Sequence, residues 1–166
     1  MTTDGDNALL KAAHTGIGSR AKVVHAAKKL LAYQKQTGRV HYTMDSRRMT
    51  IVRHKLRPPF NSVIFEDCSS SVTAYYWIAG AADPNGLDYN GLGYTGTLCQ
   101  HGEEVDLADA RPGDLLFYGS GAPWSHVTIV VGGPRGREAI SHGSEGGPRL
   151  LPFNYRTVGQ ARRYLP

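Results

Sequence analysis

The sequence contains few cysteines and no long hydrophobic run. Its 166 residues include two cysteines, Cys68 and Cys99, so at most one disulfide could form, which excludes a cysteine-rich secreted scaffold. No apolar stretch is long enough for a transmembrane helix. The polar residues 1–7, followed soon by Lys11, do not resemble a signal peptide. We therefore expect synthesis in a cytoplasm and no insertion into a membrane.

Motifs for metals and nucleotides are also missing from the sequence. It has no His-Glu-x-x-His pair, no paired Cys-x-x-Cys and no aspartate-rich loop, which are common signatures of zinc and calcium sites. It also lacks a Gly-x-Gly-x-x-Gly turn between a strand and a helix, and a phosphate-loop lysine. The sequence therefore predicts no cofactor and no metal, and cysteine chemistry is the class that remains.

Positive charge is in excess and is unevenly distributed. The formal net charge is +5, and the many basic residues from Arg20 to Arg57 are opposed only by Asp45. Such a segment carries a positive field that attracts polyanions. Proteins that bind single-stranded nucleic acid interleave aromatic with basic residues, whereas this segment has only Tyr33 and Tyr42. We therefore expect no nucleic acid partner, while a solvated helix face and contact with another polyanion both remain open.

The N-terminal part predicts a tail, a helix and an irregular stretch. Residues 1–19 are small and polar and are expected to form a flexible tail, with Ser19 as a helix N-cap. From Ala21 to Gln36 apolar residues recur at helical spacing, and Thr37-Gly38 would end this amphipathic helix. The basic residues from Arg39 to Pro59 predict an elaborated loop.

A second helix is expected directly after Cys68. The residues up to Ala79 are strongly apolar and Gly80 would end the helix, so we expect it to be the buried central helix. The segment from Ala81 to Glu104 is rich in glycine, asparagine and aspartate, and it predicts a long surface loop.

The C-terminal half predicts short strands separated by glycine and proline turns. Helices followed by strands favour an α+β fold with an antiparallel sheet. We expect residues 20–166 to form a single domain of this class. The predicted strands are Asp114–Tyr118, His126–Val131, Glu138–His142 and Ala161–Leu165.

Cys68 lies where an apolar stretch gives way to a polar step and a helix. A helix N-terminus carries a partial positive charge and unpaired N–H groups, which stabilise a thiolate, although a free cysteine is often only a small buried hydrophobe. A thiol nucleophile needs a base. His126 opens one predicted strand and His142 closes the next, so an antiparallel hairpin would bring them together. The remaining histidines are expected at the surface: His14, His25, His41, His54 and His101.

These residues, in this order, resemble the NlpC-type (NlpC and p60) cell-wall cysteine peptidases, a papain-like superfamily. The resemblance is carried by Asp67-Cys68-Ser69-Ser70 before an apolar helix, Arg111-Pro112-Gly113-Asp114-Leu115 leading into a strand, Ser125-His126-Val127, and His142. It implies a papain-like α+β fold in which a cysteine at a helix N-terminus packs on a central antiparallel sheet. It also implies Cys68 as nucleophile, His126 as general base and His142 as the residue that orients the imidazole.

The same resemblance implies residues that contact substrate. Asp67 matches an aspartate that helps to recognise the free amino end of a stem peptide, and Ser69 lines the same pocket. Tyr42 is the best local match to an aromatic residue near the oxyanion. Trp124 and Ser125, directly before the general base, complete the predicted site. Plain structural interpretations also remain open: an N-cap for Asp67, a core position for Tyr42, and satisfied strand ends for the two histidines.

The chain departs from the family pattern in three places. The basic stretch Thr43–Asn61 lies where the family has a short glycine-rich turn, and an enlarged turn, Gly132–Arg137, lengthens the hairpin between the two histidines. The loop Ala81–Glu104 exceeds the family core and is expected to form a wall of the substrate groove. Cys99 has no comparable context, and we expect it to have no role in the chemistry.

The resemblance implies a peptidoglycan endopeptidase that cuts a peptide or isopeptide bond of the murein stem peptide, D-glutamyl to diaminopimelate, through a thioester acyl-enzyme. We expect a monomeric module of an actinobacteriophage endolysin. It would stay in the host cytoplasm until lysis and then reach the periplasm or wall, with the basic segment 20–57 touching the anionic wall. Three alternative functions remain open: a virion-associated role, a Cys/His acyltransferase or amidase activity, and a non-catalytic wall-binding module. Which bond is cut also remains open.

Overall fold

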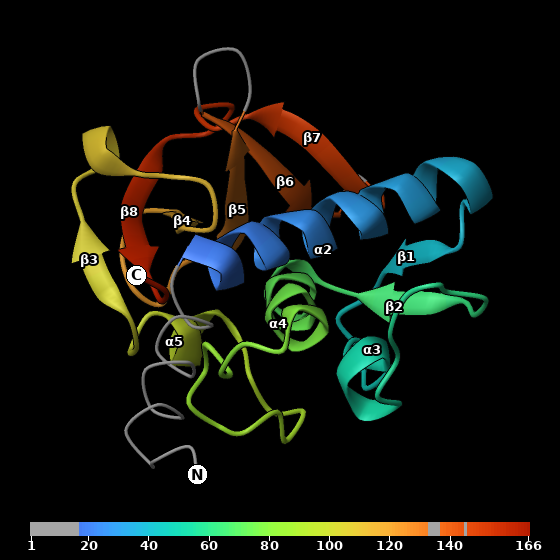
Figure 1. Cartoon of the computed structure of the whole chain (residues 1–166). Helices are drawn as coiled ribbons and strands as arrows, with labels where there is room; N and C mark the ends of the chain where they lie inside the picture. The colour runs from blue at the N-terminus through green and yellow to red at the C-terminus, as the bar shows by residue number, and fades with distance from the viewer. Residues whose placement is uncertain (1–16, 133–136, 145) are drawn as a thin grey trace, which may run out of the picture.

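The computed structural model describes residues 17–132, 137–144 and 146–166, and within them the architecture is α+β. Helices α2 and α4 pack against one face of an antiparallel sheet with the strand order β3-β8-β4-β5-β6-β7, while β1 and β2 form a separate parallel pair (Figure 1). The elements are α2 Ile17–Thr37, β1 Val40–Tyr42, α3 Thr50–Arg53, β2 Ile64–Glu66, α4 Cys68–Ala79, α5 Thr95–Leu98, β3 Glu103–Val105, a 3-10 helix Leu107–Asp109, β4 Leu115–Tyr118, β5 His126–Gly132, β6 Glu138–His142, β7 Pro148–Pro152 and β8 Val158–Arg163.

Helix α2 begins earlier than the sequence predicted. It starts at Ile17, so Ser19 lies inside its first turn and does not cap it, and the predicted tail boundary at residue 19 is wrong. The side chain of Arg20 donates a hydrogen bond to the carbonyl of Pro112, which ties this first turn to the loop before β4. Residues 1–16 of the predicted tail lie outside the described residues.

The core between the helices and the sheet uses the predicted apolar stripe of α2 and most of α4. Figure 1 shows α4 in the middle of the molecule, beneath α2, as the sequence predicted for a central helix. The helix ends at Gly80, whose positive φ of 70° is the left-handed conformation that glycine favours at this position. The buried stripe residues of α2 are Val23, Val24, Ala27, Leu30 and Leu31.

The central strands present their side chains to two different clusters. Strand β4 pairs with β5 so that Leu115 lies opposite Ile129, and Tyr118 lies opposite His126. Leu115 and Ile129 belong to the core that contains α2 and α4, whereas Tyr118 belongs to a second cluster. Because strand residues alternate between the two faces of a sheet, His126 shares the face of Tyr118.

The sequence missed the shortest strands. The parallel pair β1 and β2 and the strand β3 have three residues each, and β7 begins and ends with proline. Strands this short carry too little alternation to be recognised, and they form because partners distant in sequence pair with them. The basic stretch predicted to be irregular contains β1 and α3, and the long predicted loop contains α5 and the start of β3.

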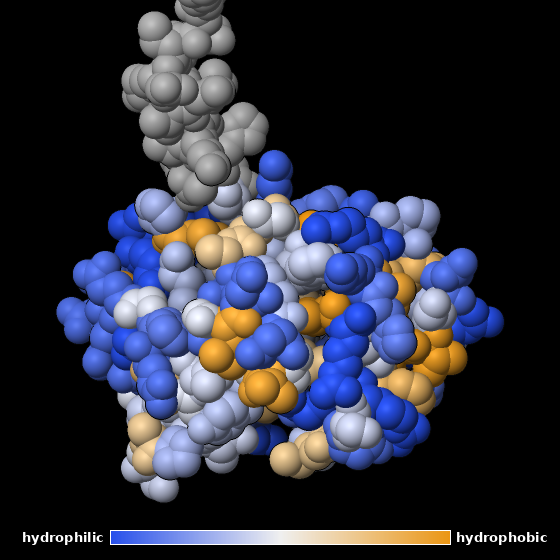
Figure 2. All heavy atoms as spheres, turned by 90° about the horizontal axis from the view of Figure 1, so that it is seen from below, coloured by the Kyte–Doolittle hydropathy of each residue, from blue (hydrophilic) through white to orange (hydrophobic). Residues whose placement is uncertain are grey.

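The surface of the described residues is predominantly polar. Figure 2 shows one face of the molecule, on which hydrophobic residues occur in small patches separated by hydrophilic side chains. The most exposed large hydrophobic residues are Met44, Leu92 and Tyr94. Across the described ranges, every helix is too short or too polar to cross a bilayer.

Candidate active site

Cys68 is the first residue of helix α4, as the sequence predicted. Asp67 caps this helix: its carboxylate accepts a hydrogen bond of 2.8 Å from the backbone N–H of Ser70, and the Ser70 hydroxyl accepts one of 2.7 Å from the backbone N–H of Asp67. This reciprocal pair fixes the backbone on both sides of Cys68. The sulfur therefore lies in the partial positive field of a capped, twelve-residue helix.

Burial nevertheless raises the pKa of the Cys68 thiol above its ordinary value, and the negative charge of Asp67 raises it further. Hydrogen bonds from the backbone N–H of Val127, from the side chain of Thr95 and from the backbone of Ser69 oppose this increase. A thiol in such a site carries its proton at neutral pH. Nucleophilic chemistry at Cys68 therefore requires a base.

His126 opens strand β5 and directly precedes Val127, whose N–H reaches the Cys68 sulfur. The imidazole is buried, and its Nε2 lies 2.8 Å from the hydroxyl oxygen of Ser141 on β6. That hydroxyl lies 3.2 Å from the hydroxyl of Tyr155, whose ring meets the imidazole edge-on. The ring of His126 is thus held on one side by a chain of two neutral hydroxyl groups.

His142 closes strand β6, but its hydrogen bond is made to a different element. Its Nδ1 lies 2.7 Å from the hydroxyl oxygen of Ser71 in α4, one turn after Cys68. The structure places Ser141 against Nε2 of His126, and the orienting role of His142 stays a prediction.

The register between β5 and β6 determines which residue lies beside His126. Ile129 of β5 lies opposite Ile140 of β6, which puts Thr128 across from Ser141. Ser141 therefore shares the face of His126, whereas His142 faces α4. The register also shifts between Val130 and Gly132. Residues 133–136 of the enlarged turn lie outside the described residues. No local sequence signal identifies Ser141, because its place beside His126 depends on how β5 and β6 pair.

Tyr42 ends β1 and lies opposite Glu66 in the parallel pair. Its ring meets the ring of His142 edge-on, with 6.0 Å between ring centroids. Tyr42 and His142 therefore lie together, and the hydrogen bond of His142 to Ser71 joins them to α4. The structure thus brings one predicted substrate residue next to one predicted catalytic residue.

Asp67 and Ser69 are brought together by an arginine that the sequence did not single out. The Nε of Arg48 lies 2.5 Å from one carboxylate oxygen of Asp67, and its Nη2 donates hydrogen bonds of 2.7 Å to the Ser69 hydroxyl and to the carbonyl of Gly93. The other carboxylate oxygen of Asp67 accepts from the hydroxyl of Ser69. Arg48 lies in the stretch that was predicted to be irregular, where no local pattern distinguishes it from its basic neighbours.

Trp124 and Ser125 lie in the loop before β5. The hydroxyl and the backbone N–H of Ser125 both donate to the carbonyl of Tyr118, which closes the turn between β4 and β5. Trp124 is partly buried and packs closely against Gly159 of β8. Both residues hold the loop that presents His126, and their contact with substrate stays a prediction.

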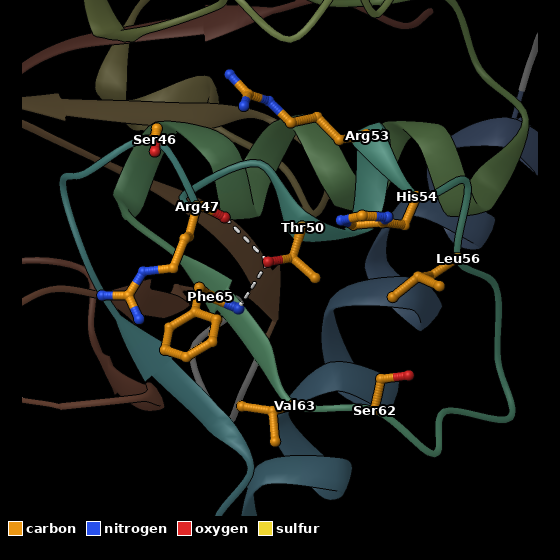
Figure 3. A pocket seen from close by; sticks show the side chains of 9 residues that line it. All are labelled: Ser46, Arg47, Thr50, Arg53, His54, Leu56, Ser62, Val63 and Phe65. Carbon is orange, nitrogen blue, oxygen red and sulfur yellow. Dashed lines mark hydrogen bonds between the residues drawn. The ribbon is translucent and has the colours of Figure 1, made fainter.

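The remaining candidates for chemistry lie elsewhere. Both cysteines are free thiols, and the sulfur of Cys99 donates to the carbonyl of Gly96 inside α5. Among the described residues, side chains that bind metals do not gather in groups of three or more. A cavity of about 640 Å³ lies beside β2, and Cys68 is not among the residues that line it. Figure 3 shows the Arg47 side chain alongside the ring of Phe65 at its edge, with His54 and Leu56 on the opposite wall.

Comparisons with known proteins show the fold. No family model matches the chain. Protein P54 of Enterococcus faecium is 33% identical in an alignment 75 residues long, and this alignment covers 37% of this chain and 14% of P54. Rv1477 of Mycobacterium tuberculosis, described as a hypothetical invasion protein, is 18% identical over 88% of this chain and 65% of its own, with a TM-score of 0.54. The NlpC/p60 domain of the peptidoglycan hydrolase SagA is 21% identical over 72% of this chain and 99% of its own, with a TM-score of 0.49.

Proposed function

The chain has the papain-like α+β fold of the NlpC/p60 cysteine peptidases, and on that premise we propose that it is a peptidoglycan peptidase with Cys68 as nucleophile and His126 as base. The observation that carries the proposal is the junction of α4 and β5. There Cys68 begins α4 and His126 begins β5, the backbone of Val127 opposes the raised pKa of the Cys68 thiol, and Nε2 of His126 lies 2.8 Å from the hydroxyl oxygen of Ser141.

In the proposed reaction, His126 removes the thiol proton of Cys68. The sulfur then adds to the carbonyl carbon of the scissile bond. The C–N bond breaks as the imidazolium returns the proton to the leaving nitrogen, and a thioester remains on Cys68. A water molecule that gives its proton to His126 hydrolyses the thioester, and the thiol is restored. The partial positive charge at the start of α4 would stabilise the developing oxyanion.

The finer assignment rests on resemblance. We propose the D-glutamyl to diaminopimelate bond of the stem peptide as the bond that is cut, and a phage endolysin as the protein that carries the domain. The chain spans 14% of the length of P54 and 65% of Rv1477. The exposed lysines of α2 are suited to an anionic wall: Lys22, Lys28, Lys29 and Lys35.

The test is digestion of purified peptidoglycan followed by mass spectrometry of the released fragments. Cys68→Ala should abolish release, whereas Cys99→Ala, the matched control for loss of a thiol, should release fragments at the wild-type rate. The new amino termini would identify the bond. Full lytic activity of Cys68→Ala would rule out the proposed function.

A further inference from the structure

The cavity beside β2 is built mainly by the basic stretch Thr43–Asn61, which lies where the family has a short glycine-rich turn. Helix α3 supplies one wall, and β2 with the residues before it supplies another (Figure 3). The volume of about 640 Å³ falls within the range of roughly 300–1,000 Å³ in which proteins hold small ligands. Neither Cys68 nor His126 lines the cavity. It is therefore a second candidate site, and no step of the proposed peptide cleavage uses it.

The charged side chains in the lining are all cationic. Arg47 donates to both carboxylate oxygens of Asp45, so most of its charge is balanced. Arg53 is exposed, and within the described ranges 17–132, 137–144 and 146–166 its guanidinium forms no ion pair with a carboxylate. The exposed imidazole of His54 adds a further nitrogen to the lining. The cavity thus presents an uncompensated positive charge to an anion.

The walls of the cavity are joined to each other without any ligand. The hydroxyl of Thr50 in α3 donates to the carbonyl of Arg47 at 2.9 Å and accepts from the backbone N–H of Phe65 at 3.1 Å. Figure 3 shows these two hydrogen bonds, which tie α3 to β2. A site that is formed in advance loses less conformational freedom when a ligand binds.

Apolar surface lies beside the cationic groups. Leu56 is partly buried and Val63 is 46% exposed, and both border the cavity. Burial of apolar surface favours binding. The ligand that fits this lining therefore carries a negative charge with carbon-rich units next to it.

The lining does not favour nucleic acid, although its charge would attract one. Single-stranded nucleic acids bind by stacking their bases on aromatic rings. The guanidinium of Arg47 lies over the phenyl ring of Phe65, 4.4 Å from its centroid, and the ring centroid of His41 lies 5.6 Å from the same point. This phenyl ring already has two partners, so it offers little surface on which a base could stack.

We infer that this cavity binds an anionic polymer in which phosphodiester groups join polyol units. The planar guanidinium of Arg53 matches the geometry of phosphate oxygens, while the carbon atoms of the polyol would lie against Leu56 and Val63. The exposed lysines of α2 would attract an anionic wall through charge alone, whereas the cavity selects one chemistry. Binding here would hold the domain on walls that carry such a polymer.

The experiment is isothermal titration calorimetry of the whole chain with poly(glycerol phosphate), in which no bond is cut. We expect saturable binding that weakens as the salt concentration rises from about 50 to 200 mM, because ion release accompanies phosphate contacts. Polyglucuronate and single-stranded DNA of equal total charge should bind about tenfold more weakly or less. Binding of either polymer as tight as that of poly(glycerol phosphate), or an absence of saturable binding at the lower salt concentration, would overturn the inference.

Matched variants assign the binding to the cavity. Arg53→Gln should weaken it by about tenfold, the effect of losing one charge-assisted hydrogen bond. Lys35→Gln removes one positive charge from the exposed face of α2, outside the cavity lining, and should change the affinity by less than about twofold. Equal weakening by the two variants would overturn the inference, because it would show that binding depends on net charge alone.

Two further variants separate the cavity from charge and from catalysis. Ser46→Trp fills the cavity from an exposed lining position without a change of charge, and it should weaken binding by about tenfold or more. Wild-type affinity in this variant would overturn the inference even if Arg53→Gln did not fold. Cys68→Ala should bind as the wild type does, so a failure of the proposed function would appear as absent cleavage with binding intact.

Discussion

At the scale of single residues, a neutral network fixes the imidazole of His126. The hydroxyl of Ser141 bridges Nε2 of His126 and the hydroxyl of Tyr155. A hydroxyl fixes the orientation of an imidazole as a carboxylate does, but it stabilises the imidazolium less, because charge-assisted hydrogen bonds are the stronger ones. The hydrogen bond at Nε2 of the base in this site is therefore made to a hydroxyl group.

The first prediction separates the two candidates for the orienting residue. Ser141→Ala removes the hydrogen bond at Nε2, and we expect kcat/KM to fall by about 10- to 100-fold, since misplacing a general base forfeits part of its contribution. The acid limb of the pH–rate profile should also move. Fold stability should fall by only about 1 kcal/mol, the net value of one hydrogen bond.

The companion variant is His142→Asn, which perturbs the contact with Ser71 in α4. Its main effect is expected on thermal stability, with an unmoved acid limb, because Ser141 still holds His126. If His142→Asn moved the acid limb and Ser141→Ala did not, the orienting role would return to His142.

A second prediction at this scale concerns Glu66, whose carboxyl lies next to the active-site segment. Burial raises the pKa of Glu66 from an ordinary 4.5 to about 8. Between these two pH values the carboxyl of Glu66 therefore keeps its proton in the folded state and loses it in the unfolded state. The stability linked to this proton is fully present below about pH 4.5 and is lost as pH rises towards 8, at about 1.4 kcal/mol per pH unit.

Glu66→Gln removes this titration while keeping the shape of the side chain. Urea unfolding followed by circular dichroism at pH 5, 6.5 and 8 should show a decline in wild-type stability that is much weaker in Glu66→Gln. Equal slopes in the two proteins would mean that Glu66 does not titrate in this range.

At the scale of elements, the helices and the central strands could be predicted from the sequence, whereas the contacts that set the site could not. Helix α4 is encoded locally, by an apolar run between the cap at Asp67 and Gly80. Strands β4 to β6 are local hydrophobic runs as well. Arg48, by contrast, acquires its role only when Asp67, Ser69 and Gly93 meet it in space.

The features of the candidate active site also divide into those that local sequence patterns predict and those that depend on long-range contacts. Cys68 at a helix start and His126 at a strand start follow from local patterns, and the structure places them there. The neighbour of His126 depends on the register of β5 against β6, and a one-residue change exchanges Ser141 for His142. Register is a long-range property, and sequence spacing could not supply it.

At the scale of the whole molecule, Asp114 joins the two ends of the described chain. One of its oxygens lies 3.0 Å from Nη1 of Arg20 in α2, and the other lies 2.8 Å from Nη2 of Arg163 in β8. The backbone N–H of Arg111 donates to the same carboxylate. The side chain of Asp114 is 1% exposed, so the charges of both arginines are balanced at a buried position.

The last prediction follows from this arrangement. Asp114→Ala leaves two partly buried guanidinium groups without their counter-ion, and breaking a buried pair in this way costs about 3–5 kcal/mol. Urea unfolding should show that loss as a lower midpoint with an unchanged slope.

Asp45→Ala breaks the exposed pair with Arg47 and is the matched control, which should leave the midpoint essentially in place because exposed pairs contribute little. Similar midpoints for the two variants would show that the network of Asp114 does not hold α2 to β8. A lowered midpoint for Asp114→Ala alone would show that a residue within the Pro-Gly-Asp-Leu motif stabilises the sheet from outside the site, because Asp114 touches neither Cys68 nor His126 in any of these bonds.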